Sequence, residues 1–210
     1  MVDYGELKDA VILGKAAVVK ELTQKALDEG KNPQEVLDQA LIPAMDVVGQ
    51  KFSCAEFYIP EMLIAARAMQ GGVALLKPRL AAQGAKARGK VVLGTVKGDL
   101  HDIGKNLVGM MLEGAGFEIH DLGTDVPPEK FVEAVRTSGA NVVGMSALLT
   151  TTMPGMKSVI EGLAQAGLRH RVKVIVGGAP LTDAYARQIG ADGYAPDASR
   201  AVALTKSLLT

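Results

Sequence analysis

A change of hydrophobic period near residue 90 constrains the fold more than any other feature of the sequence. From that point onward, short apolar runs alternate with segments of helical periodicity. Expected strands lie at 90–95, 118–121, 141–145, 172–176 and 193–195, and expected helices at 103–115, 128–138, 153–166, 181–189 and 198–208. Strands that alternate with helices pair in parallel through right-handed crossovers. The pattern therefore predicts an α/β domain with a doubly wound, five-stranded parallel sheet over residues 90–210.

The N-terminal part of the chain shows helical periodicity throughout. Asn32 is expected to cap one helix, with Glu35 reaching back to the start of that helix as in a capping box. A break at residues 53–56 precedes the last expected helix. Apolar helices joined by short loops predict a four-helix bundle over residues 1–85. Residues 84–89 are expected to link the two domains.

Composition argues against several classes of protein. The chain has 48% hydrophobic residues, 4% aromatic residues, no tryptophan and a formal net charge of zero. A nucleic-acid-binding surface is therefore not expected. We see neither an apolar run of the ~18 residues that span a bilayer nor a secretory signal. The lone Cys54 is expected to be a small buried apolar residue in a cytoplasmic protein, because it cannot form an internal disulfide.

A histidine stands in the Gly-rich loop that follows the first expected strand. In Asp99-Leu100-His101-Asp102-Ile103-Gly104, a carboxylate precedes the imidazole by two residues. Such a carboxylate can hold the imidazole by its Nδ1–H and leave Nε2 as a metal ligand. In an open α/β sheet, this loop lies at the carboxyl end of a strand, where ligands bind. Taken alone, however, Asp-x-His is more often a structural hydrogen-bonded pair.

Two later elements favour the functional interpretation. Ser146-Ala147-Leu148 follows Gly104 after 41 residues (positions 105 to 145), and Gly177-Gly178 follows after 28 more (149 to 176). In this order and spacing, the three elements resemble the cobalamin-binding domain of methionine synthase and the corrinoid carrier proteins of methyltransferase systems. The resemblance implies a flavodoxin- or Rossmann-like cobalamin-binding domain over residues 90–210. It also implies a helical cap domain over residues 1–85.

The resemblance assigns the metal chemistry to a trio of side chains. His101 would be the lower axial ligand of cobalt, displacing the cofactor's own dimethylbenzimidazole. Asp99 would accept the other ring proton of His101. Thr152, six residues after Ser146, would extend the relay with its hydroxyl.

The resemblance assigns the remaining residues to cofactor binding. Gly104 would leave room for the displaced nucleotide tail, and two further strand ends would line the same slot. The residues implied are Gly98, Asp99, His101, Asp102, Ile103, Gly104, Ser146, Leu148, Thr150, Gly177 and Gly178. In the helical part, Phe52, Ile59 and Met62 would cover the methyl-bearing face; the alternative is that these three are ordinary core residues.

The function implied is that of a corrinoid protein that carries a methyl group on cobalt. It would accept the methyl group from a substrate-specific methyltransferase acting on a methylamine, methanol, betaine or an aromatic methyl ether. A second methyltransferase would transfer it to tetrahydrofolate or coenzyme M, and a reductive activator is an expected partner. Three alternatives stay open: a cobalamin-binding subunit of a mutase, a cobalamin-dependent regulatory sensor, and a flavodoxin-like module that binds no corrin.

Overall fold

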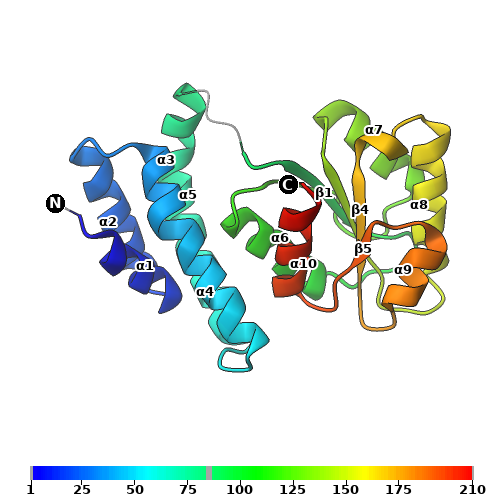
Figure 1. Ribbon diagram of the computed structural model, residues 1–210, viewed down its shortest axis with the longest axis horizontal. Helices are drawn as coiled ribbons and strands as arrows, with labels where there is room; N and C mark the ends of the chain where they lie inside the picture. The colour runs from blue at the N-terminus through cyan, green and yellow to red at the C-terminus, as the bar shows by residue number, and fades with distance from the viewer. Residues whose placement is uncertain (1, 84–86, 210) are drawn as a thin grey trace. The chain divides into compact units, whose positions relative to one another are not determined.

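The computed structural model describes residues 2–83 and 87–209. It divides the chain into two compact units, of which the first comprises Met1–Ala87 with Glu113–Gly116, and the second Arg88–Leu112 with Phe117–Thr210. The first is helical and the second is an α/β sheet unit (Figure 1). Residues 84–86 of the expected linker lie outside the described residues.

The helical unit follows the predicted bundle. Its elements are α1 (Tyr4–Ile12), α2 (Ala16–Asp28), α3 (Pro33–Val36), the π-helical turn η1 (Leu37–Leu41), α4 (Ile42–Ser53) and α5 (Ile59–Ala82). The α3, η1 and α4 segments form one continuous helix, in which the Ile42 amide donates to the Leu37 carbonyl, five residues back. Pro43 comes next and has no amide hydrogen to donate, which is a local reason for the wider turn.

The start of α3 differs from the predicted capping box. The Asn32 side chain accepts a hydrogen bond from the Gln34 amide (2.9 Å), as expected of an N-cap residue. Glu35 instead accepts a hydrogen bond from the Tyr4 hydroxyl (3.2 Å), a residue distant in sequence. A tertiary partner has therefore replaced the local one.

The loop between α4 and α5 contains the cysteine of this chain. Cys54 is exposed, so the prediction of a buried apolar residue is wrong. Its amide still bonds to Gln50 at the end of α4, but Ala55 next to it has φ +58°. The left-handed conformation of Ala55 directly follows the C-cap, so the helix cannot continue through it.

By length and composition, Ile59–Leu80 of α5 is long and apolar enough to cross a membrane, which the sequence analysis did not predict. The core helix of a soluble protein passes the same test of length and composition. In this helix the side chains of Met62, Ala66 and Met69 are buried within the structure.

A buried hydroxyl in α2 gives a stability prediction. Thr23 is fully buried, and its hydroxyl has no hydrogen-bond partner among the described residues. Because burying an unpaired hydroxyl costs about 1–2 kcal/mol, Thr23→Val is expected to raise the free energy of unfolding by about that amount, measured by urea denaturation. Thr205→Val is the matched control, since the equally buried Thr205 donates to the Ala201 carbonyl (2.7 Å) and its replacement should destabilise. Equal losses for both variants would contradict the prediction.

The α/β unit contains the predicted sheet, with element ends within about two residues of those expected. Its strands are β1 (Lys90–Thr95), β2 (Glu118–Asp121), β3 (Val142–Ser146), β4 (Lys173–Gly177) and β5 (Gly193–Tyr194). Its helices are α6 (Ile103–Gly114), α7 (Pro128–Ser138), α8 (Pro154–Gln165), the 3-10 turn η2 (Arg169–Arg171), α9 (Asp183–Ile189) and α10 (Ala198–Leu208). Over the described residues the strands are all parallel, in the order β2-β1-β3-β4-β5.

Helices cover both faces of the sheet, with α6 and α10 on one and α7, α8 and α9 on the other (Figure 1). On the second face, strand residues such as Val92 and Val143 form one buried cluster with Phe131 of α7 and Met156 of α8. The chain therefore leaves the neighbouring strands β1 and β3 toward opposite faces. Ligands bind at such a switch point in open α/β sheets.

Candidate functional site

The carboxylate of Asp99 collects hydrogen bonds from two loops at this switch point. Asp99 is fully buried in the loop after β1. Its Oδ1 accepts from Nδ1 (2.7 Å) and from the backbone amide (3.1 Å) of His101. Its Oδ2 accepts from the loop after β3, through the amides of Leu148 (2.7 Å) and Leu149 (3.3 Å) and the hydroxyl of Thr152 (2.8 Å). The hydrogen bonds expected within the trio Asp99, His101 and Thr152 are therefore present.

These contacts determine which nitrogen of His101 is available. Burial by itself raises the pKa of Asp99, but the hydrogen bonds from Leu148, His101 and Thr152 outweigh it and hold that pKa well below its usual range. An ionised carboxylate only accepts hydrogen bonds. Nδ1 of His101 therefore carries a hydrogen, and Nε2 remains for a ligand on a side chain that is 52% exposed.

The structure brings the other predicted residues of the α/β unit to neighbouring strand ends. Ser146 and Gly177 are the last residues of β3 and β4, and they are register partners. Around them lie the loop after β1 with the start of α6, the loop after β3, and the residue after β4, which hold Gly98, Asp102, Ile103, Gly104, Leu148, Thr150 and Gly178. Phe52 and the pair Ile59 and Met62 belong to α4 and α5 of the helical unit. Met62 is fully buried, whereas Ile59 is 47% exposed.

Two of the predicted glycines differ in what surrounds them. A Cβ at Gly104 would meet no atom within 4 Å, so no protein neighbour requires glycine there. A Cβ at Gly178, where φ is +138°, would lie 1.9 Å from the carbonyl oxygen of Ala147. Gly178 is thus required by the packing of the loop after β4 against the loop after β3, whatever ligand binds.

Large apolar side chains are exposed to water in the two loops that carry His101 and bind Asp99. Leu100 is 74% exposed and Ile103 is 77% exposed, on either side of the histidine. Leu148 and Leu149, whose amides bond to Asp99, are each 41% exposed. We call these four residues the apolar rim. Exposed apolar clusters of this kind mark binding surfaces.

Sequence reasoning missed several features of the site. Lys105 is almost fully buried at the start of α6, where its ammonium group pairs with Asp121 at the end of β2 (2.5 Å) and with Asn106 (2.7 Å). Lysine is rarely buried, so the burial of Lys105 and its pairing with Asp121 were not expected from the sequence. The amide donors of Leu148 and Leu149 also left no signal, because every residue except proline carries one.

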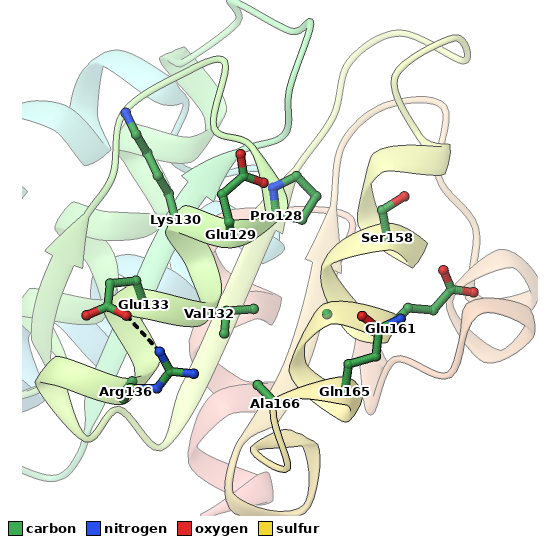
Figure 2. A pocket seen from close by; sticks show the side chains of 11 residues that line it. Pro128, Glu129, Lys130, Val132, Glu133, Arg136, Ser158, Glu161, Gln165 and Ala166 are labelled. Atoms are coloured by element: carbon green, nitrogen blue, oxygen red, sulfur yellow. Dashed lines mark hydrogen bonds and ion pairs between the residues drawn. The ribbon is translucent and has the colours of Figure 1, made fainter.

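A concave surface lies between α7 and α8 (Figure 2), and no member of the trio lines it. Charged side chains line much of it, including Lys130, Glu161 and the ion pair of Arg136 with Glu133 (3.0 Å). None of the predicted site residues is among its lining residues. The strand ends are therefore the better candidate site.

Comparison with known proteins agrees with this placement. A family model described as a B12 binding domain matches residues 89–203, and a second of the same description matches residues 4–77. The dimethylamine corrinoid protein 3 of Methanosarcina acetivorans is 48% identical, over 97% of this chain and 95% of its own.

Solved structures agree across both units. A cobalamin-binding protein from Desulfitobacterium hafniense has 32% identity and a TM-score of 0.81, covering 99% of this chain and 98% of its own. The methanol:cobalamin methyltransferase complex MtaBC from Methanosarcina barkeri has 30% identity and a TM-score of 0.87, covering 97% of this chain and 78% of its matched chain.

The residues at the strand ends fit a corrinoid. A half-exposed imidazole held through Nδ1 can offer Nε2 to a metal, and the apolar rim beside it offers a surface for a large ring. The open space at Gly104 leaves room for a bulky group near the start of α6. The chain therefore belongs to the family of B12-binding corrinoid proteins, and its cofactor is a corrinoid.

Proposed function

We propose that this methyl-carrying corrinoid protein accepts its methyl group from a methyltransferase specific for dimethylamine. The name of the relative with 48% identity supports this donor class over methanol, which is named for a relative with 30% identity. A second methyltransferase, acting on tetrahydrofolate or coenzyme M, would remove the methyl group. A reductive activator and a cytoplasmic location complete the proposal, and the free thiol of Cys54 suits a reducing compartment.

The observation that supports the methyl-carrying role is the hydrogen bond between Asp99 and Nδ1 of His101. When bound, the corrinoid supplies a cobalt centre that can hold a methyl group and give it up. His101 would bind that metal through Nε2. Asp99 fixes the ring orientation and the tautomer, because it accepts Nδ1–H at 2.7 Å. Asp99 and His101 thus form a hydrogen-bonded pair in which Nε2 is the ring nitrogen left for the metal.

Thr152 is suited to adjust that pair. Its hydroxyl lies 2.8 Å from Oδ2 of Asp99 and 2.9 Å from the carbonyl oxygen of Leu149. A hydroxyl has one hydrogen and can donate to only one of these acceptors at a time. Rotation of the Thr152 hydroxyl about its Cβ–Oγ1 bond would thus add or remove a hydrogen bond to the carboxylate that orients His101.

The helical unit would shield the methyl-bearing face. We propose Phe52, Ile59 and Met62 for that role. Ile59 offers an exposed apolar surface, whereas Met62 is fully buried and would have to become exposed to reach the methyl group. A shield of this kind must move when a methyltransferase approaches the methyl group.

Gly104 gives a prediction that separates folding from cofactor binding. Gly104→Ala is expected to leave the cofactor-free protein as stable as before, or up to about 1 kcal/mol more stable, because alanine favours a helix. The same change should weaken binding of hydroxocobalamin about 10-fold or more, since the added methyl group fills space that the protein leaves open. Urea denaturation and a spectroscopic titration measure the two effects. Unchanged affinity would remove Gly104 from the cofactor site.

The donor is tested with the cognate methyltransferase, recovered by pull-down with this protein as bait. The corrinoid-loaded and reduced protein is mixed with that enzyme and with dimethylamine, monomethylamine, trimethylamine or methanol in turn. Dimethylamine should change the absorbance spectrum of the bound corrinoid fastest. Faster change with methanol would overturn the assignment of the donor while leaving the corrinoid site unaffected.

A further inference from the structure

Asp125, in the loop after β2, makes two hydrogen bonds to the loop that carries Asp99 and His101. Asp125 donates its backbone amide to the carbonyl oxygen of Asp99 (3.0 Å). Its side-chain Oδ1 accepts from the amide of Gly98 (2.7 Å). Asp125 therefore binds two consecutive residues of this loop, Gly98 through its side chain and Asp99 through its backbone.

The backbone conformation of Asp125 is unusual. Its φ is +53°, which is left-handed and uncommon for a residue other than glycine. Aspartate and asparagine tolerate this region best. In this conformation the amide and the carboxylate of Asp125 both bond to the loop after β1.

The surrounding backbone makes this connection part of a short ladder. Thr95 donates to Gly123 (2.9 Å), and Val126 donates back to Thr95 (2.9 Å). Val96 and Val126 form a parallel bridge beyond the last paired residues of β1 and β2. Asp125 directly precedes Val126, so its hydrogen bonds to Gly98 and Asp99 adjoin this ladder and connect the end of the sheet to the loop that carries His101.

Asp99 is thereby fixed from two sides. The loop after β3 holds its carboxylate, whereas Asp125 holds its backbone carbonyl. We propose that Asp125 is a positioning residue, which fixes the turn at Gly98 and Asp99 so that Asp99 can orient His101 for metal binding. This inference rests on the proposed role of His101 as the axial ligand.

Three variants separate the side-chain acceptor from the backbone conformation. Asp125→Asn retains both an acceptor and tolerance of positive φ. Asp125→Gly retains only the conformation, and Asp125→Ala retains neither. Asp197→Ala is the matched control, because Asp197 is an aspartate of the same unit whose Oδ1 accepts from the amide of Arg200 (2.8 Å) and caps α10 instead of a loop of the site.

The first readout needs no cofactor. Amide hydrogen exchange of the full chain, measured by NMR, should show that exchange of the Gly98 amide becomes about 5- to 10-fold faster in Asp125→Gly and Asp125→Ala. Asp125→Asn should remain within about 2-fold of the original protein. Asp197→Ala should leave the Gly98 amide unchanged.

The second readout uses hydroxocobalamin as the probe. Asp125→Gly and Asp125→Ala should lower its affinity about 3- to 10-fold and reduce the fraction whose spectrum reports histidine ligation, with recovery in Asp125→Asn. Unchanged Gly98 exchange and ligation in Asp125→Gly, or the same loss in Asp197→Ala, would overturn the proposal. If His101→Ala leaves ligation intact, the proposed role of His101 fails, whereas the exchange readout still reports whether Asp125 fixes the loop.

Discussion

Replacing His101 with alanine is expected to abolish histidine ligation and to lower the affinity for hydroxocobalamin about 100-fold or more. Changes to residues that merely support a metal ligand cost about 10- to 100-fold in affinity, so loss of the ligand itself should reach or exceed that range. The EPR spectrum of the bound cobalt(II) form measures the effect, because isotopic labelling of the histidine nitrogens alters the hyperfine splitting only when a histidine, and not benzimidazole, is the ligand below the cobalt.

His120→Ala provides the matched control for this variant. His120 is an exposed histidine of β2 in the same unit, and it is not among the residues proposed to bind the cofactor. Its replacement should change neither the spectrum nor the affinity by more than about 2-fold. A His101→Ala protein with an intact spectrum would show that the corrinoid does not use this imidazole.

Gly178→Ala is expected to destabilise the fold by about 3 kcal/mol or more. Its Cβ would lie 1.9 Å from the carbonyl oxygen of Ala147, and the residue has φ +138°. Both the clash and the strained conformation must be relieved by movement of the backbone. Because Ala147 directly precedes Leu148, whose amide bonds to Asp99, the shift would also disturb the trio. Urea denaturation of the cofactor-free protein measures the loss.

Gly190→Ala separates the strain from the clash. Gly190 also has a positive φ (+78°), but a Cβ there would meet nothing within 4 Å. Its replacement should cost only about 1 kcal/mol. If Gly178→Ala loses no more stability than Gly190→Ala, the close approach to Ala147 is not what requires glycine.

The sequence predicted the sheet well because its signals are local. Apolar runs such as 90–95 stand between helical patterns, and that alternation determines the order in which strands and helices form. β3 and β4 each begin and end one residue later than predicted, because the register in which Ser146 pairs with Gly177 decides where these strands end. Element ends depend on partners that a sequence does not name.

The trio was predictable for a different reason. Asp99 and His101 are close in sequence, and the resemblance supplied Thr152, which lies 53 residues from Asp99. The amide donors from Leu148 and Leu149 were not predictable, because they depend on backbone geometry alone. The same limit applies to Asp125, whose contribution follows from a left-handed conformation. The roles of Phe52, Ile59 and Met62 stay predictions.

The apolar rim has a consequence for how this protein matures. Burial of apolar surface stabilises by about 25 cal/mol per Å², yet Leu100 and Ile103 keep about three quarters of their surface in water after the chain has folded. Folding thus leaves apolar surface beside the imidazole that the protein itself does not bury. Cofactor loading would complete it, so that the last hydrophobic contacts of the domain form in a binding event.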